Sequence, residues 1–382
     1  MEKQKSDKSF QDDGKKNNNC HSEKNQKVKL PPSPAFLIVL MGSLGDVTRG
    51  LCLVSQIKAC FPGSSITWLI EPKCKEVVTF HPQIDTLLVF DRPNWKQSLK
   101  DLFNTLRTSH FDCVLDLQRH FKSGFFSFLS GAPCRIGFHK KNAKEFNWIF
   151  NNNHIPYVYE YYPKLFHYLT FTEFLGCPRP ESLDFGFSGP RLLLMAADVL
   201  SKVRRPFIAI VLGTTWVSKE WFFDSYARLI GDLLKETSLH VVMVDTMAKY
   251  DMACELEKKT QSSRLINLVG KTSILELAAV FKEASVGVGP DCGSAHISAA
   301  VKTPYVTLFG PTSPERTAPY GSEDLVVSVN MACAPCYKRK CPQKDTPCMR
   351  NITVEDVKEK IFQGLNRFNL SSQRLAGKDQ SR

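Results

Sequence analysis

The 382-residue sequence predicts two α/β domains that face a shared cleft. Two glycine-rich turns carry this prediction, Gly42–Asp46 and Gly289–His296. Each turn follows a run typical of a buried strand, Phe36–Met41 and Ser285–Val288, and opens into a helical pattern. A turn of this kind leaves unpaired backbone N–H groups at a helix start, where negative charge is favoured. Two such turns so far apart cannot belong to one unit, so we expect two domains.

In the first half, a polar and disordered tail (1–33) precedes an alternation of strands and helices that indicates a parallel sheet covered on both faces. The expected strands are Phe36–Met41, Ile66–Ile70, Thr86–Phe90, Cys113–Leu117 and Arg135–Phe138. The expected helices are Leu51–Cys60, Glu76–Phe80, Leu99–Ser109 and Tyr161–Leu175. We assign residues 34–190 to an N-terminal domain that ends in a proline- and glycine-containing connection, Cys177–Pro190.

The second half repeats the alternation, and we assign residues 191–366 to a C-terminal domain. Its expected strands are Pro206–Leu212, Val241–Val244, Leu265–Val269, Val286–Gly289 and Tyr305–Phe309. Its expected helices are Phe223–Glu236, a helix from Met247, Ile274–Glu283, Ala295–Val301 and the amphipathic Thr353–Asn366, with Thr353 as N-cap. Residues 367–382 are expected to form a flexible tail.

The composition favours a cytoplasmic globular protein, with 43% hydrophobic and 23% charged residues. The start lacks the apolar region of a signal peptide, and no run approaches the roughly 18 apolar residues that span a bilayer. The formal charge is +12. The basic residues concentrate in Leu117–Lys144, a segment without acids, which fits an acidic substrate, a phosphorylated lipid at a membrane face or a solvated basic surface.

Several common motifs are absent from the sequence: G-x-G-x-x-G at the first turn, the P-loop, G-x-S-x-G and a D-x-D pair. Without a D-x-D pair to hold a divalent cation, the charge of a bound nucleotide diphosphate would be neutralised by protein cations and helix starts. The second half of the chain offers a cation and helix starts. The loop Gly213–Trp221 places Thr214, Thr215 and Lys219 after a strand, and Asp291–His296 begins a second helix at the same sheet edge, where Gly293 permits close approach of a ligand.

These residues, from about Ala35 to Asn366, resemble glycosyltransferase family 9, the ADP-heptose:lipopolysaccharide heptosyltransferases. The similarity rests on five stretches in the family's order. They are Gly45-Asp46-Val47, Thr214-Thr215 with Lys219 and Trp221, Asp291-x-Gly293-x-x-His296, Leu308–Pro314 and Pro319-Tyr320-Gly321. The resemblance implies the GT-B fold, two Rossmann-like domains around an active site, and inverting transfer without a catalytic metal or cofactor.

The resemblance also implies roles for individual residues. Asp46 corresponds to the general base that takes a proton from the acceptor hydroxyl, and a carboxylate suits this role because it is ionised at pH 7. The implied donor-binding set is Thr214, Thr215, Lys219, Asp291, Cys292, Gly293 and His296, with Asp251 nearest to the family's ribose-binding acid. Cys292 replaces the usual Thr or Ser. Lys122, assisted by Arg119 and Arg135, corresponds to the acceptor side.

Four cysteines lie close together in the sequence: Cys333, Cys336, Cys341 and Cys348. Four thiols within so short a segment fit a tetrahedral structural Zn²⁺, and reduced thiols are the alternative. The remaining cysteines stand singly in apolar surroundings and are expected to be reduced.

The predicted function is therefore transfer of heptose from ADP-heptose to the lipopolysaccharide inner core, with peripheral contact to the cytoplasmic face of the inner membrane and no nucleic-acid partner. Two alternatives stay open. One is a GT-B enzyme with another nucleotide-sugar donor, such as a uridine one, or with epimerase chemistry. The other is a basic protein, not an enzyme, that binds polyanions or membrane surfaces.

Overall fold

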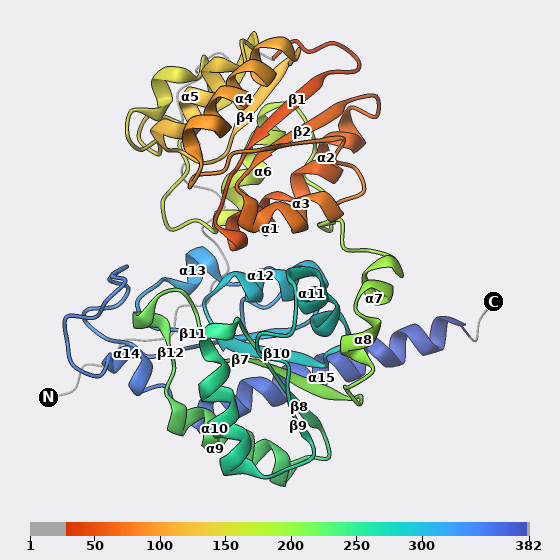
Figure 1. Ribbon diagram of the computed structural model, residues 1–382, viewed down its shortest axis with the longest axis vertical. Coiled ribbons are helices and arrows are strands. Elements are labelled where there is room, and N and C mark those ends of the chain that lie inside the picture. The colour runs from red at the N-terminus through yellow and green to blue at the C-terminus, as the bar shows by residue number, and fades with distance from the viewer. Residues whose placement is uncertain (1–27, 380–382) are drawn as a thin grey trace, which may run out of the picture.

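The computed structural model describes residues 28–379, which form an upper N-terminal and a lower C-terminal domain (Figure 1). Residues 1–27 of the predicted tail, and residues 380–382, lie outside the described residues. Each domain is a six-stranded parallel sheet with helices on its faces. This confirms the predicted fold class.

The N-terminal sheet has the strand order β3-β2-β1-β4-β5-β6, which is that of the Rossmann fold. Its strands are β1 (Ala35–Val39), β2 (Ser65–Ile70), β3 (Thr86–Val89), β4 (Cys113–Asp116), β5 (Cys134–Gly137) and β6 (Asn153–His154). Its helices are α1 (Leu44–Gly50), α2 (Cys52–Cys60), η1 (Pro72–Cys74), α3 (Lys75–Phe80), α4 (Trp95–Thr108), α5 (Phe121–Leu129), η2 (Asn147–Phe150) and α6 (Lys164–Phe174). The sequence did not predict α5, η2 or β6.

The C-terminal sheet repeats this order as β9-β8-β7-β10-β11-β12. Its strands are β7 (Phe207–Val211), β8 (His240–Val244), β9 (Leu265–Asn267), β10 (Val286–Pro290), β11 (Tyr305–Phe309) and β12 (Val326–Ser328). The larger helices are α7 (Arg191–Met195), α9 (Phe223–Glu236), α10 (Tyr250–Thr260), α11 (Ile274–Glu283), α12 (Gly293–Ala300) and α15 (Val354–Asp379). The short ones are α8 (Ala197–Leu200), η3 (Val217–Lys219), η4 (Met247–Lys249), α13 (Pro314–Thr317) and α14 (Pro347–Arg350).

Burial explains the continuous apolar strands. All five residues of β7 are buried, as are all of β10 and β11, because helices cover both faces of the sheet. Helices α9 and α11 have the predicted bounds. The last helix runs past its predicted end at Asn366 to Asp379, since no proline interrupts the sequence there.

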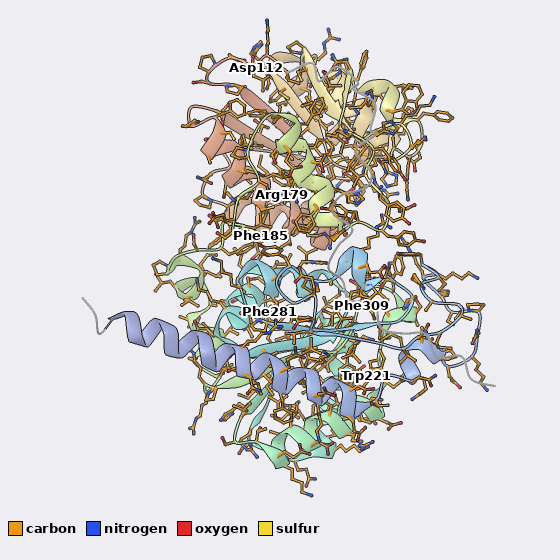
Figure 2. All side chains as sticks on the ribbon, turned by 180° about the vertical axis from the view of Figure 1, so that it is seen from behind. Asp112, Arg179, Phe185, Trp221, Phe281 and Phe309 are labelled. Atoms are coloured by element: carbon orange, nitrogen blue, oxygen red, sulfur yellow. The ribbon has the colours of Figure 1, made fainter. Side chains whose placement is uncertain are left out.

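The two domains share one apolar cluster, which continues from the N-terminal sheet through Phe185 to Phe207 and Phe281. Figure 2 shows Phe185 where the domains meet and Phe281 in the domain below. A polar contact adds to this interface, because the Glu76 carboxylate of α3 accepts hydrogen bonds from the backbone N–H groups of Ile274 and Leu275, at 3.3 Å each. These groups begin α11, where an acidic side chain stabilises the helix.

A buried carboxylate ties the end of β4 to α5 and η2. Asp116 is fully buried and accepts hydrogen bonds from the side-chain amides of Asn147 (2.6 Å) and Asn151 (3.2 Å). Burial raises the pKa of Asp116, and these amide donors act against that rise. The network therefore fixes the segment that follows β4.

We expect Asp116→Ala to lower the free energy of unfolding by about 3 kcal/mol, because Asn147 and Asn151 would lose their acceptor inside the protein. Urea denaturation measures this loss. Asp101→Ala, in exposed α4, is the matched control and should change stability by less than about 0.5 kcal/mol. Equal effects of the two substitutions would contradict the structural role of Asp116.

Candidate active site

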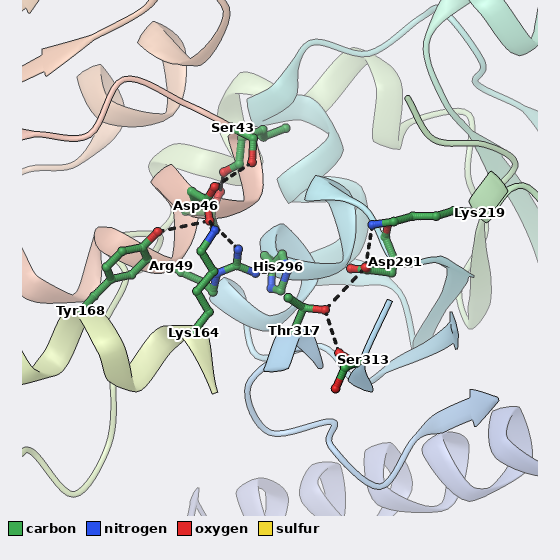
Figure 3. A network of polar contacts seen from close by, with 12 residues as sticks. Ser43, Asp46, Arg49, Lys164, Tyr168, Lys219, Asp291, His296, Ser313 and Thr317 are labelled. Atoms are coloured by element: carbon green, nitrogen blue, oxygen red, sulfur yellow. Dashed lines mark hydrogen bonds and ion pairs between the residues drawn. The ribbon is translucent and has the colours of Figure 1, made fainter. Parts of the chain in front are cut away.

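Asp46 lies in the first turn of α1, at the carboxyl end of β1, as the sequence predicts. Its Oδ1 accepts hydrogen bonds from Arg49 Nη2 (2.6 Å), Tyr168 OH (3.1 Å) and the Lys164 ammonium. Its Oδ2 accepts one from Ser43 Oγ at 3.1 Å. Figure 3 shows these side chains converging on the carboxylate. Oδ1 is thus held by three donors, while Oδ2 has one neutral partner.

The charges around Asp46 set its protonation state. Burial alone would raise the pKa of Asp46, but Lys164 and Arg49 outweigh burial and hold the pKa well below its usual range. Burial also lowers the pKa of the Lys164 ammonium to about 8, although Asp46 acts in the opposite direction. Asp46 is therefore ionised at pH 7, next to a lysine that titrates close to neutrality.

Arg49 connects Asp46 to the other domain, because its Nη1 contacts Nε2 of His296 in α12 (Figure 3). Burial lowers the pKa of His296 well below its ordinary value, and Arg49 adds to this effect. The ring is therefore neutral and accepts the Arg49 proton at Nε2. Lys219 lowers the pKa of His296 further and Asp46 raises it, so charges from both domains act on this one ring.

Lys219 lies at the carboxyl edge of the C-terminal sheet. Its ammonium lies 2.7 Å from Asp291 Oδ2 and donates to the Asp291 carbonyl at 3.3 Å. The same Oδ2 accepts hydrogen bonds from Thr312 Oγ1 (2.7 Å) and Thr317 Oγ1 (3.5 Å). Asp291 thereby holds Lys219 next to the start of α12.

Two glycines allow α1 and α12 to pack against each other. A Cβ on Gly45 would lie 2.7 Å from His296 Cδ2, and one on Gly293 would lie 3.1 Å from the Leu44 side chain. The sequence interpreted Gly293 as space for a ligand, whereas in the structure the missing Cβ makes room for the neighbouring domain. The close approach brings the two glycine-rich turns into contact with each other.

A pocket of about 440 Å³ opens beside Asp46. The residues that line it come from α1, α6 and the loops that follow β1, β4 and β5, and include Asp46, Arg119, His120, Lys164 and Tyr168. The structure thus places one predicted acceptor residue, Arg119, in the same pocket as the predicted base.

The other two predicted acceptor residues lie apart from this lining. Lys122 forms an ion pair with Glu71 at 2.8 Å. Arg135 lies on β5, where its guanidinium donates to the carbonyls of Phe150 (3.0 Å) and Ala132 (2.6 Å). These carbonyl contacts hold the Arg135 guanidinium in place, and its role on the acceptor side stays a prediction.

Of the remaining donor candidates, Thr214 and Thr215 lie in the loop after β7, and Cys292 is the N-cap of α12. Asp251 was the predicted ribose ligand, but it lies on the exposed first turn of α10. Asp245, at the end of β8, lies nearer the loop instead and accepts a hydrogen bond from Gly213 N at 2.7 Å. The ribose-binding role of Asp251 stays a prediction.

The four clustered cysteines line one pocket of about 440 Å³, together with Ser218. Within residues 28–379, however, no three His, Cys, Asp or Glu side chains are close enough to hold a metal ion as they stand. The cysteine loop also contacts the segment that carries Lys219, since Ser218 Oγ donates to the Lys338 carbonyl at 2.6 Å. The predicted zinc site thus stays a prediction.

Sequence reasoning missed Arg49, Lys164 and Tyr168. Arg49 had a signal, because it follows Asp46 by three residues on a predicted helix and such pairs face each other. Lys164 and Tyr168 also share a helix face, but the pattern did not reveal that this face points to α1.

The comparisons identify the family. A family model described as glycosyltransferase family 9 (heptosyltransferase) matches residues 99–346. The lipopolysaccharide core heptosyltransferase OpsX of Haemophilus influenzae is 27% identical, over 78% of this chain and 85% of the relative. Lipopolysaccharide heptosyltransferase 1 of Pseudomonas aeruginosa is also 27% identical, over 81% and 88%.

Solved structures agree on the fold. A glycosyltransferase family 9 structure from Veillonella parvula has a TM-score of 0.71 at 18% identity, covering 88% of this chain and 97% of that one. The Escherichia coli heptosyltransferase WaaC with ADP has a TM-score of 0.69 at 20% identity, with 86% and 99% covered. The fold is GT-B.

The titration of Lys164 gives a testable pH dependence. Its pKa in the folded protein, about 8, lies below the value of an unfolded lysine, so the folded chain binds fewer protons above pH 8. The Lys164 contribution to stability therefore rises with pH across this interval. We expect wild type to gain about 2 kcal/mol relative to Lys164→Met between about pH 7 and pH 9.5.

Urea denaturation of both proteins at each pH measures this difference. Lys164→Arg is the control, because arginine stays protonated over the interval and should lack the gain as the Met variant does. A difference between wild type and Lys164→Met that stays constant with pH would contradict the assigned titration.

Proposed function

Because this chain belongs to glycosyltransferase family 9, and is a glycosyltransferase, we propose that it transfers a heptose from ADP-heptose to the inner core of lipopolysaccharide. Relatives named as lipopolysaccharide heptosyltransferases support the sugar and the acceptor. The similar WaaC structures, one with ADP and one with an ADP-heptose analogue, support the donor.

Asp46 acts as the general base. The acceptor hydroxyl enters the pocket beside α1 and donates its proton to Oδ2, the carboxylate oxygen that Arg49 and Lys164 leave free. The three donors on Oδ1 keep the carboxylate ionised and fixed in orientation. A base placed on the acceptor side, opposite the leaving group, is what inversion at the anomeric carbon requires.

Lys219 and the start of α12 stabilise the departing ADP. As the bond to the anomeric carbon breaks, negative charge grows on the diphosphate, and an ammonium ion with backbone N–H groups offsets it. Thr214 and Thr215 supply hydroxyl donors from the loop after β7. Asp291 keeps its partners Thr312 and Thr317 when the Lys219 ammonium turns to the phosphate. In this scheme the protein cations take the part of a catalytic metal.

The single observation that carries the proposal is the contact between Arg49 and His296. It joins the helix of the base to the helix whose start faces the donor. Asp46 and Lys219 then approach one sugar from opposite domains.

The acceptor is lipid-anchored, so we place the protein at the cytoplasmic face of the inner membrane, in peripheral contact. No helix within residues 28–379 is long and apolar enough to cross a bilayer. Contact with the membrane must therefore come from the described surface or from the undescribed termini.

Substitution of Asp46 and of Lys219 should separate loss of proton transfer from loss of donor binding. Asp46→Asn keeps the shape of the side chain but removes the proton acceptor, so we expect kcat to fall roughly a hundredfold to ten-thousandfold. ADP affinity should stay within about twofold of wild type. Transfer to heptose-free core lipopolysaccharide and ADP titration calorimetry measure the two quantities.

Lys219→Met is the reciprocal variant, and it should weaken ADP binding by about tenfold or more, because a charge-assisted contact is lost. Equal loss of ADP binding in both variants, or full turnover by Asp46→Asn, would contradict the assigned roles. A thermal-shift series of ADP, UDP and GDP tests the donor nucleotide in the same preparation, since a bound ligand stabilises the fold.

The four clustered cysteines provide a separate test. A structural zinc there would require their thiols to rotate toward one another within the shared pocket, and wild type should then contain about one Zn²⁺ per chain. Cys336→Ser with Cys341→Ser should lose the metal and weaken ADP binding, because this loop contacts the Lys219 segment. Elemental analysis measures the metal. If the thiols of these four cysteines react with a thiol reagent and the protein contains no zinc, the cysteines are reduced instead.

A further inference from the structure

The N-terminal domain carries most of the large apolar side chains that are exposed in the described residues. They cluster on α5, η2 and the following loop, at the edge of the domain where α5 is labelled in Figure 1. Phe128 is 55% exposed, Phe146 73% and Ile149 56%. We define an aromatic–lysine surface that consists of Phe121, Phe128, Phe146, Ile149 and Tyr157 with Lys140, Lys141 and Lys144.

Ring contacts connect several of these side chains. Phe150 of η2 lies 5.0 Å from Phe121 and 6.3 Å from Phe128, between ring centroids, so η2 packs along the outer face of α5. Beyond η2, the Lys140 ammonium lies 4.6 Å from the Trp148 ring and that of Lys141 lies 6.0 Å from Tyr157. Lysine ammonium groups therefore lie next to aromatic rings in this part of the domain.

The segment that carries this surface has more cations than acids. Between residues 119 and 158 the cations are Arg119, Lys122, Arg135, Lys140, Lys141 and Lys144, and the acid is Glu145 alone. The Glu145 carboxylate lies 3.1 Å from His120 Nδ1 and accepts a hydrogen bond from Phe121 N, at 3.1 Å. Its charge is thus turned toward the start of α5, and Lys140, Lys141 and Lys144 stay exposed.

The surface adjoins the pocket of the proposed base. His120, which precedes α5, lines the pocket with Asp46, and Phe121 is the next residue in the chain. An acceptor whose lipid chains lie in a bilayer against this surface could therefore place its sugar head group in the pocket while its chains stay in the bilayer.

We propose that the aromatic–lysine surface docks the protein on an anionic phospholipid bilayer, a proposal that rests on the proposed function for the lipid-anchored acceptor. Exposed aromatic and apolar side chains enter the headgroup region, and lysines next to them bind acidic lipids. This combination fits a bilayer better than nucleic acid, which needs the cations but not Phe146 or Ile149. The docked protein holds its acceptor pocket at the membrane.

Flotation with vesicles tests the apolar part of the surface. The probes are vesicles of phosphatidylethanolamine with phosphatidylglycerol, and vesicles of phosphatidylcholine alone. We expect wild type to float with the anionic vesicles, and Phe146→Asn with Ile149→Ser to lower the bound fraction about tenfold. Asparagine suits position 146, where φ is 55°. Leu194→Ser with Met195→Ser, two equally exposed residues of α7, is the matched control and should float as wild type does.

The charged part has its own matched pair. Lys140→Glu, Lys141→Glu and Lys144→Glu together should abolish flotation with anionic vesicles. The same charge change in the other domain, at Lys235, Lys258 and Lys302, should leave flotation within about twofold of wild type.

Transfer assays separate this inference from the proposed function. All surface variants should transfer heptose to a deacylated, soluble acceptor at the wild-type rate, which also shows that they fold, and should lose transfer to the acceptor embedded in vesicles.

Surface variants that float like wild type would overturn the docking surface. So would loss of flotation in the lysine variant alone, which indicates general polyanion binding. If flotation depends on the aromatic–lysine surface but the protein transfers no heptose, the docking inference stands and the proposed function is refuted.

Discussion

The contact between Arg49 and His296 is the constraint on which the arrangement of the site depends. Arg49 donates to Asp46 on its own helix and to His296 on the facing helix, so one guanidinium contacts both the proposed base and the other domain. This requires a neutral imidazole, because a protonated ring would repel the arginine. Burial keeps the pKa of His296 low and thereby makes the contact compatible with neutral pH.

The packing around this contact is equally demanding. Gly45 and Gly293 bring α1 and α12 so close that a methyl group on either glycine would meet the other domain. Apolar side chains continue across the interface in a single cluster. The two domains therefore meet through shape as well as charge, at the helices α1 and α12.

Much of this could be predicted from the sequence, and the exceptions have physical reasons. Strand ends predict a sheet edge, so the positions of Asp46, Lys219 and Asp291 followed from the buried runs before them. Lys164 and Tyr168 could not be placed, because only the packing of α6 against α1 decides which face of that helix points to Asp46. Helix α5 escaped prediction because its burial reverses the usual pattern: Ser123 and Ser127 are buried, while Phe121 and Phe128 are exposed.

The low pKa of Asp46 is at first sight a poor property for the base that we propose, and the geometry resolves the difficulty. An acceptor hydroxyl becomes strongly acidic only as its oxygen bonds to the anomeric carbon, so the proton leaves late and a weak base suffices. A carboxylate that is always ionised and always in one orientation then matters more than a basic one. Three donors on Oδ1 provide both properties and leave Oδ2 for the proton. In the proposed mechanism, the cations that lower the basicity of Asp46 are therefore the groups that keep it ionised and fixed in orientation.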